Sequence, residues 1–235
     1  MRLDKFLCDM GQGTRSQVKE FIRKGLVQVD GSVCKRPETQ VTETQSITCQ
    51  GNLVSYVSLE YYMLHKPAGV LSATEDRRQQ TVLDLIESKK RKDLFPVGRL
   101  DKDTEGLLLI TNDGPLAHSL LSPKRHVDKT YYARVDGELR PEYVERFAKG
   151  LDIGDEKPTM PAKLELLSAD EIRLTIKEGR FHQVKRMLEA VGCQVTYLKR
   201  LSMGPLTLDD SLAPGEYRAL TSREVQMLKE CNNGC

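Results

Sequence analysis

The sequence has no hydrophobic run that approaches the length of a membrane span, and charged residues occupy positions where a secretory signal would need an apolar stretch. Its six cysteines include no Cys-x-x-Cys pair, and its four histidines have no ligand-like spacing with each other or with the cysteines. A glycine-rich phosphate loop is also absent. These absences predict a cytoplasmic protein with reduced thiols, without membrane attachment, a metal or another cofactor.

The net charge is nearly balanced, with 36 Lys and Arg against 34 Asp and Glu, but the charges are unevenly distributed. Residues 1–36 carry eight basic and four acidic residues, and residues 173–200 carry seven and two. Residues 37–60 contain no Lys or Arg. Two separated basic segments favour two nucleic-acid-facing surfaces on different modules. The alternative is ordinary solvated surface charge.

Residues 1–59 are predicted to form a separate small domain. Apolar residues recur at helical spacing from Leu3 to Met10, and a second helix follows a cap at Thr14 or Ser16. The alternating residues 27–29 and the following Asp-Gly pair predict a β-hairpin. The domain is therefore expected to fold as helix, helix and hairpin, with residues 52–58 as a linker.

Residues 60–235 are predicted to form a larger α+β domain with a mainly antiparallel mixed sheet and flanking helices. Its strands are expected near residues 61–66, 130–135, 162–167, 172–176 and 194–198. Its helices are expected over residues 81–86, 116–121, 143–148, 183–191 and 220–229, the last begun by a capping box of Thr221 and Glu224. The charged residues 87–93 are expected to be exposed, and residues 230–235 to form a frayed tail.

One segment of this larger domain places a carboxylate where an active site is expected. Asp101 follows Arg99 in a glycine-bounded turn, and the apolar run 107–110 then leads to the turn residues 111–114. Taken alone, Asp101 is more often an ordinary loop residue. This segment closely resembles the catalytic segment of the pseudouridine synthases, in the version of the RsuA branch that acts on ribosomal RNA. The resemblance lies in the order Gly-Arg-Leu-Asp, then Thr and Gly, then an apolar run and Thr-Asn-Asp-Gly.

That resemblance implies roles for residues in three blocks. Asp101 is implied to be the catalytic carboxylate, with Asp103 and Thr104 holding the loop. Arg99 is implied to fill the place of a flipped nucleotide or to bind its phosphate, since flipping costs a few kcal/mol; the alternative is a structural salt bridge. In the Lys-x-Tyr block, Tyr131 is implied to stack on the extruded uracil, whereas Tyr132 is expected to point the opposite way into the core.

The third block, residues 178–187, is implied to supply a cation beside the acid, and Lys185 is the position that aligns. A cation within about 4–6 Å favours the ionised form of a carboxylate. Arg180 and Arg186 are then expected to bind the RNA backbone. Pseudouridine formation needs no redox step or phosphate transfer, so no cofactor is implied. Whether the acid attacks the ribose carbon or removes a ribose proton stays open.

The N-terminal module resembles the S4 family of RNA-binding domains, from its Arg-Leu-Asp-Lys-Phe-Leu start through the Val-Gln-Val-Asp-Gly hairpin. In that family, basic residues of the second helix and the hairpin contact RNA phosphates, which position the RNA but carry little sequence information. The residues implied here as RNA ligands are Arg2, Lys5, Arg15, Lys19, Arg23 and Lys35.

The sequence therefore predicts a monomeric pseudouridine synthase that modifies one uridine of ribosomal RNA, free or in a pre-ribosomal particle. The compact length and the N-terminal start are most similar to the branch that acts on small-subunit 16S rRNA. Enzymes for 23S rRNA share every catalytic motif and remain an alternative. A non-catalytic ribosome-assembly protein is a second alternative, and a two-carboxylate hydrolase is a third.

Overall fold

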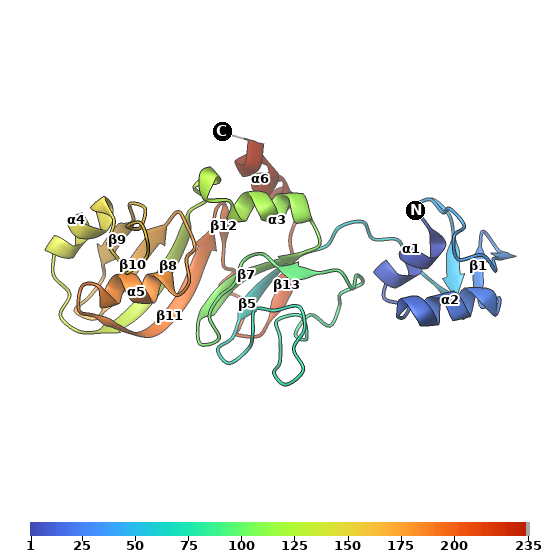
Figure 1. Cartoon of the computed structure of the whole chain (residues 1–235), viewed down its shortest axis with the longest axis horizontal. Helices are drawn as coiled ribbons and strands as arrows, with labels where there is room; N and C mark the ends of the chain where they lie inside the picture. Colours follow the sequence, from blue (N-terminus) through green and yellow to red (C-terminus); the bar gives the residue numbers. More distant parts are fainter. Residues whose placement is uncertain (234–235) are drawn as a thin grey trace. The chain divides into compact units, whose positions relative to one another are not determined.

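The computed structural model describes residues 1–233, which divide into two compact units (Figure 1). The first unit contains residues 1–60 together with residues 87–94, and the second contains the rest of the described chain. The sequence placed the boundary after residue 59 and assigned residues 87–94 to the larger domain. Within residues 1–233, no helix has the length and apolar character that crossing a membrane requires.

The first unit has two helices followed by four short strands. They are α1 (Leu3–Asp9), α2 (Arg15–Arg23), β1 (Val27–Val29), β2 (Ser32–Val33), β3 (Ile47–Cys49) and β4 (Asn52–Leu53). The strands form an antiparallel sheet in the order β2-β1-β3-β4. The predicted order of helix, helix and hairpin is confirmed.

Local sequence explains where α2 begins and how the chain turns from β3 into β4. Thr14 accepts a hydrogen bond from the backbone N–H of Gln17, whose side chain bonds back to Thr14, so α2 begins with a capping box. The prediction of a linker over residues 52–58 is wrong at its start. Gln50 and Gly51 both adopt positive φ, which makes a tight turn and brings Asn52 and Leu53 back to pair with β3.

Residues 87–93 are exposed as predicted, with one exception: Arg91 is buried in the first unit. Arg91 is only 6% exposed, and its guanidinium donates to the Asp93 carboxylate at 2.6 and 2.7 Å and to the Val57 carbonyl at 2.8 Å. Asp9 lies 3.4 Å from the same guanidinium, and Glu60 accepts the backbone N–H of Arg91. These polar contacts allow one arginine of an exposed charged segment to be buried, because each of its donors has an acceptor.

The second unit is built on one mixed sheet of nine strands. Its strands are β5 (Tyr61–Lys66), β6 (Phe95–Pro96), β7 (Glu105–Thr111), β8 (Lys129–Asp136), β9 (Lys163–Leu166), β10 (Glu171–Ile176), β11 (Gln194–Met203), β12 (Leu206–Thr207) and β13 (Tyr217–Ala219). The order is β13-β5-β7-β11-β8-β10-β9, with β6 beside β7 and β12 beside β11. The β7–β11 pair is parallel and the other pairs are antiparallel, which confirms the predicted α+β class.

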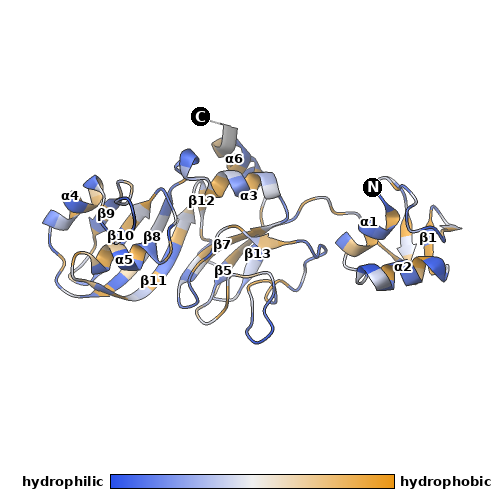
Figure 2. Ribbon diagram, in the orientation of Figure 1, coloured by the Kyte–Doolittle hydropathy of each residue, from blue (hydrophilic) through white to orange (hydrophobic). Residues whose placement is uncertain are grey.

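Short helices cover this sheet (Figure 1). They are α3 (Gly114–Leu121), the 3-10 helix η1 (Pro123–Arg125), α4 (Glu142–Lys149), α5 (Gln183–Glu189) and α6 (Ser222–Asn233). Helices α3 and α6 pack together, α5 packs on β11, and α4 packs on β9. Figure 2 shows hydrophobic residues along α3 and the central strands. Their shared core includes Met63, Leu107, Leu109, Leu116, Leu120, Met203 and Leu228.

Three predicted elements of this unit need correction. Residues 81–86 form turns rather than a helix, because Asp84 accepts from both the backbone and hydroxyl of Thr81 while the backbone of Val82 bonds to Leu71. Strand β11 runs five residues beyond its predicted end, to Met203. Helix α6 continues through Asn233, so most of the predicted tail is helical; residues 234 and 235 lie outside the described chain. The capping box at Thr221 is confirmed.

Candidate active site

The loop between β6 and β7 carries Asp101, and its shape depends on the buried Lys66 at the end of β5. The Lys66 ammonium donates to the carbonyl oxygens of Pro67, Lys102 and Thr104 at 2.9, 3.2 and 2.9 Å. Its side chain is fully buried, and this burial lowers the pKa of Lys66 to about 8. Because two of its three acceptors belong to the loop after Asp101, Lys66 holds the backbone that presents the carboxylate.

A glycine after this loop permits the close approach of β7 to β11. Gly106 has φ +104°, and a Cβ at this position would lie 2.2 Å from the carbonyl oxygen of Arg200. The two residues are register partners in the parallel β7–β11 pair. Any larger residue would push the strands apart, so Gly106 keeps the loop of Asp101 beside the strand of Arg200.

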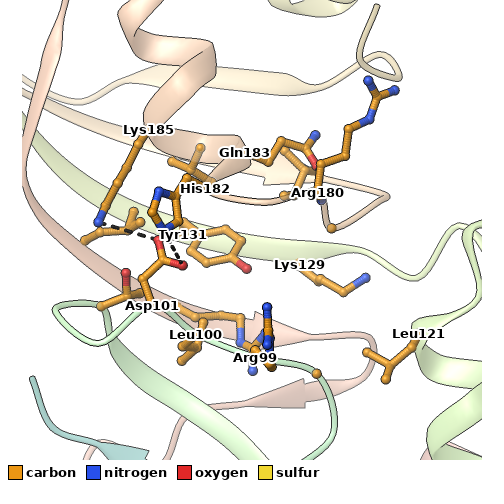
Figure 3. Close-up of a pocket in the computed structure, with 17 residues that line it drawn as sticks. Arg99, Leu100, Asp101, Leu121, Lys129, Tyr131, Arg180, His182, Gln183 and Lys185 are labelled. Carbon is orange, nitrogen blue, oxygen red and sulfur yellow. Dashed lines mark hydrogen bonds and ion pairs between the residues drawn. The ribbon is translucent and has the colours of Figure 1, made fainter. Parts of the chain in front are cut away.

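Asp101 lies between two basic side chains from the start of α5 (Figure 3). Its Oδ2 is 3.5 Å from Lys185 Nζ, and its Oδ1 is 3.5 Å from His182 Nε2. Lys185 also donates to both oxygens of Asp103, at 2.7 and 2.8 Å, and this hydrogen bond lowers the pKa of Asp103. Lys185 therefore bridges two carboxylates of the same loop rather than pairing with Asp101 alone.

The geometry at the start of α5 brings His182 toward the acid. His182 adopts φ +49° at the residue before the helix, a conformation that is uncommon outside glycine. The ring of Phe181, which is 69% exposed, stacks on the imidazole with a centroid separation of 3.8 Å. Strained backbone at a charged pocket is typical of functional sites. The sequence motifs indicated no role for His182 in the site.

Tyr131 lies on β8 with its ring almost fully buried against the same pocket (Figure 3). It is the direct cross-strand partner of Arg200 on β11. Tyr132 points to the other face, as predicted, but it is not in the core. It is half-buried, its hydroxyl donates to Glu171, and its ring makes an edge contact with Tyr197. The alternation of β8 buries the odd-numbered residues, so the face that carries Tyr131 is the buried one.

These side chains line one cavity of about 110 Å³ within the second unit. Its walls include Arg99, Asp101, Thr104, Leu121, Lys129, Tyr131, Ile176, Arg180, His182, Gln183, Lys185, Leu198 and Arg200. Arg99 is exposed and also borders an adjoining groove with Ser72 and Phe181. Among residues 1–233, Arg99 forms no ion pair or hydrogen bond, so the predicted alternative of a structural salt bridge is wrong.

Arg180 and Arg186, which the sequence assigned to the RNA backbone, already bind protein groups. Arg180 donates to Glu178 and to the carbonyl oxygens of Lys157 and Pro158. Arg186 donates to Asp155, and this hydrogen bond lowers the pKa of the Asp155 carboxyl. Both guanidiniums thus hold the loop that precedes β9, and their contact with RNA stays a prediction.

The basic residues of the first unit fall into two groups. Arg2 pairs with Asp4 and Lys5 pairs with Asp9, each at 2.9 Å. The other predicted ligands make no ion pair within the described chain, and all but the half-buried Lys19 are exposed; they are Arg15, Lys19, Arg23 and Lys35. The second group is therefore free to meet phosphates.

The arrangement suits chemistry at a ribose carbon. A partly exposed carboxylate beside a lysine ammonium can attack that carbon or remove a neighbouring proton, and a buried aromatic ring can hold a planar base next to it. Four pocket or loop residues were missed as functional candidates, although Lys129 and His182 stand inside the Lys-x-Tyr block and the block 178–187. The four are Lys66, Lys129, His182 and Arg200, of which Arg200 lies beyond the predicted end of its strand.

Comparisons with known proteins agree with this chemistry. The model of the RNA pseudouridylate synthase family matches residues 60–190, and that of the S4 domain matches residues 1–47. An uncharacterized RNA pseudouridine synthase of Bacillus subtilis, YtzG, is 50% identical and covers 98% of this chain and 99% of its own length.

Two further relatives extend the comparison. Ribosomal small subunit pseudouridine synthase A of Vibrio cholerae is 44% identical over 96% of this chain and 98% of its own. The crystal structure of a pseudouridylate synthase aligns with a TM-score of 0.69 and 38% identity, over 97% of this chain and 99% of that one. Because the catalytic family model spans more than half of the chain and the relatives match both units, the chain belongs to the RNA pseudouridine synthases and carries an S4 domain.

Proposed function

We propose that this protein converts one uridine of small-subunit 16S rRNA to pseudouridine, with Asp101 as the catalytic carboxylate. The observation that carries the catalytic assignment is the position of Asp101 beside Lys185 and His182, in the cavity that Tyr131 lines. The target is supported by relatives that are named for the small ribosomal subunit and match nearly the whole chain.

Each site residue has a proposed task. Asp101 attacks the ribose carbon or removes a ribose proton, Lys185 pairs with this carboxylate, and Tyr131 stacks on the uracil. Arg99 fills the gap of the flipped nucleotide or binds its phosphate, which its exposure and lack of a partner within residues 1–233 support. The S4 domain binds flanking RNA through its basic side chains. The proposed setting is the cytoplasm, with the protein acting as a monomer.

The decisive test is a map of pseudouridine across ribosomal RNA from cells with and without this protein, by chemical labelling and primer-extension stops. Loss of one signal in 16S rRNA is the expected result, and re-expression of the wild-type protein restores it. Loss in 23S rRNA instead would keep the reaction and replace the proposed target. No lost signal in either RNA would contradict the proposal and favour the non-catalytic alternative.

A further inference from the structure

Two cations are buried at one end of the active-site cavity without a carboxylate partner. Lys129 is 6% exposed and Arg200 is 2% exposed, and both line the cavity. The Lys129 ammonium donates to the Val127 carbonyl at 3.1 Å, and Arg200 Nε donates to the Leu107 carbonyl at 2.7 Å. Within the described chain neither forms an ion pair, and Arg200 Nη2 has no hydrogen-bond partner at all.

The protein holds these two charges together at an electrostatic cost. Burial and, to a smaller extent, the nearby positive charge of Arg200 together lower the pKa of Lys129 to about 8. Buried charges in proteins are normally paired, because an unpaired charge loses its hydration without compensation. Two adjacent buried cations therefore indicate that their partner is a ligand carrying negative charge or carbonyl oxygens.

Their position relative to Tyr131 identifies which part of the substrate they meet. Arg200 is the cross-strand partner of Tyr131, and Figure 3 shows Lys129 beyond the hydroxyl end of that ring, on the side away from Asp101. The buried hydroxyl of Thr104 also lines the cavity and has no partner in the described chain. If a base stacks on Tyr131 with its ribose at Asp101, the edge of the base that is opposite the ribose points toward Lys129 and Arg200.

The reaction places negative charge on that base. When the bond from N1 of uracil to C1′ of ribose breaks, the electron pair stays on N1 and spreads over the two carbonyl oxygens. The anion turns, C5 forms the new bond to C1′, C5 loses its proton, and N1 gains one, so the product is an isomer. We propose that Lys129 and Arg200 bind the uracil carbonyl oxygens and stabilise this detached anion; the inference rests on the proposed function.

The first test compares Lys129→Gln and Lys129→Arg with wild type, and uses Lys149→Gln, an exposed lysine of α4, as the control. Because groups that stabilise transient negative charge contribute roughly 100- to 1000-fold, Lys129→Gln should slow single-turnover isomerisation at saturating enzyme by about that factor. Its RNA dissociation constant should change less than about threefold, because phosphate contacts dominate affinity. Unchanged rate in Lys129→Gln, with an active wild type, would overturn the inference and leave the proposed function standing.

A second measurement does not depend on the stability of the glutamine variant. Arg200 from β11 and Asp128 before β8 act on the charge of Lys129. The other titratable groups of the same cavity are Arg99 and Asp101 from the loop between β6 and β7, Tyr131, Arg180, His182 and Lys185. Lys66, with a similar pKa, also supports that loop. These groups titrate in both proteins, so their effects cancel when kcat/KM of Lys129→Arg is divided by kcat/KM of wild type at each pH. This ratio should rise as pH increases through about 8, since arginine stays protonated. A flat ratio would contradict the role of the ammonium charge.

A third measurement separates the base from the phosphate as the bound group. One RNA carries pyrimidin-2-one, which lacks the O4 carbonyl, at the target position, and another carries an uncharged methylphosphonate on its 5′ side. With the base contact, wild type binds the pyrimidin-2-one RNA more weakly than its uridine parent, and Lys129→Gln loses this difference. If the methylphosphonate instead weakens binding to wild type but not to Lys129→Gln, the Lys129 ammonium binds the RNA phosphate rather than the base. This result would overturn the inference.

Discussion

At the scale of single residues, the catalytic assignment depends on one carboxylate, that of Asp101, which lies 3.5 Å from both Lys185 and His182. Changing Asp101 to Asn keeps the size of the side chain and removes its charge and basicity. We expect isomerisation to fall by at least about 100-fold, because the side chain can neither attack carbon nor accept a proton. The measurement is pseudouridine formed per enzyme on the target RNA. Binding of that RNA should stay within about threefold, and retained activity in Asp101→Asn would remove Asp101 from the mechanism.

The residues that sequence reasoning found and missed differ in a physical way. Asp101, Tyr131 and Lys185 stand at fixed positions of recognisable motifs, so their positions could be predicted, although their roles still need experiments. The pairing of Lys185 with Asp103 and the contact of His182 with Asp101 depend on the loop and the positive φ before α5. Such contacts come from tertiary geometry that no spacing along the chain encodes.

At the scale of secondary structure elements, the parallel β7–β11 pair depends on Gly106. Replacing Gly106 with Ala places a methyl group 2.2 Å from a backbone oxygen that cannot move alone. We expect a loss of more than about 2 kcal/mol in unfolding free energy, measured by urea titration, because strand separation adds to the cost of positive φ. Gly69→Ala is the matched control, since it also has positive φ but nothing within 4 Å of its Cβ. Equal losses in the two variants would contradict the clash.

A salt-bridged arginine joins β13 to α6 and makes stability depend on pH. Arg218 donates to Glu224 at 2.8 and 2.9 Å and to Asp209 at 2.6 Å. The hydrogen bond from Arg218 is the main cause that lowers the pKa of Glu224 to about 2. Because the folded pKa lies below the usual 4.5, the stabilisation is complete above about 4.5 and is lost as pH falls toward 2.

Glu224→Gln should therefore destabilise the protein by about 1 kcal/mol at pH 7 and by progressively less below pH 4.5. Urea midpoints at pH 7, 4 and 2.5 measure this convergence with wild type. Glu145→Gln serves as the comparison, because Glu145 makes an exposed pair with Lys149 at 3.8 Å and should show little effect at any pH. A constant difference at all three pH values would exclude the ionised carboxylate as its source.

The success of sequence reasoning at this scale follows the strength of local signals. Helix α2 was predicted from a cap at Thr14 or Ser16, and helix α6 from a capping box at Thr221, and the structure has a capping box at the start of each. The turns at 81–86 were mistaken for a helix because buried Val82, Leu83 and Ile86 have helical spacing, whereas Asp84 and Leu71 redirect the backbone. Strand β11 was predicted too short because its second half pairs with distant strands on both sides.

At the scale of the whole molecule, the S4 unit is expected to contribute affinity rather than chemistry. The double change of Arg15 and Arg23 to Gln should weaken RNA binding and reduce the slope of log K against log salt by roughly 0.7–0.9 for each phosphate that the variant no longer binds. The single-turnover rate at saturating enzyme should be unchanged. Arg140→Gln, on an exposed residue of the second unit that pairs with Glu138, controls for the removal of charge alone. An unchanged salt slope in the double variant would contradict phosphate binding by α2.

The division of the chain into two units could be predicted only in part from the sequence. Composition separated a small N-terminal module, but the return of residues 87–94 to that unit depends on Arg91, whose acceptors are far apart in sequence. Local composition correctly predicted that this charged stretch is exposed, but it did not indicate that Arg91 is buried in the first unit. Any truncation near residue 59 would remove Asp9 and Val57 and leave a buried guanidinium without two of its partners.

The pairing of β13 with β5 sets the moment at which this enzyme is complete during its synthesis. Leu64 pairs with Tyr217, so the strand that ends in Lys66 has an open edge until the chain has grown past residue 219. Domains form from the N-terminus as the ribosome extends the chain, and open strand edges are sites of aggregation. The first unit is complete once the chain has grown past residue 94, whereas the catalytic sheet closes only after residue 219, so we expect the ability to bind RNA to precede the ability to modify it.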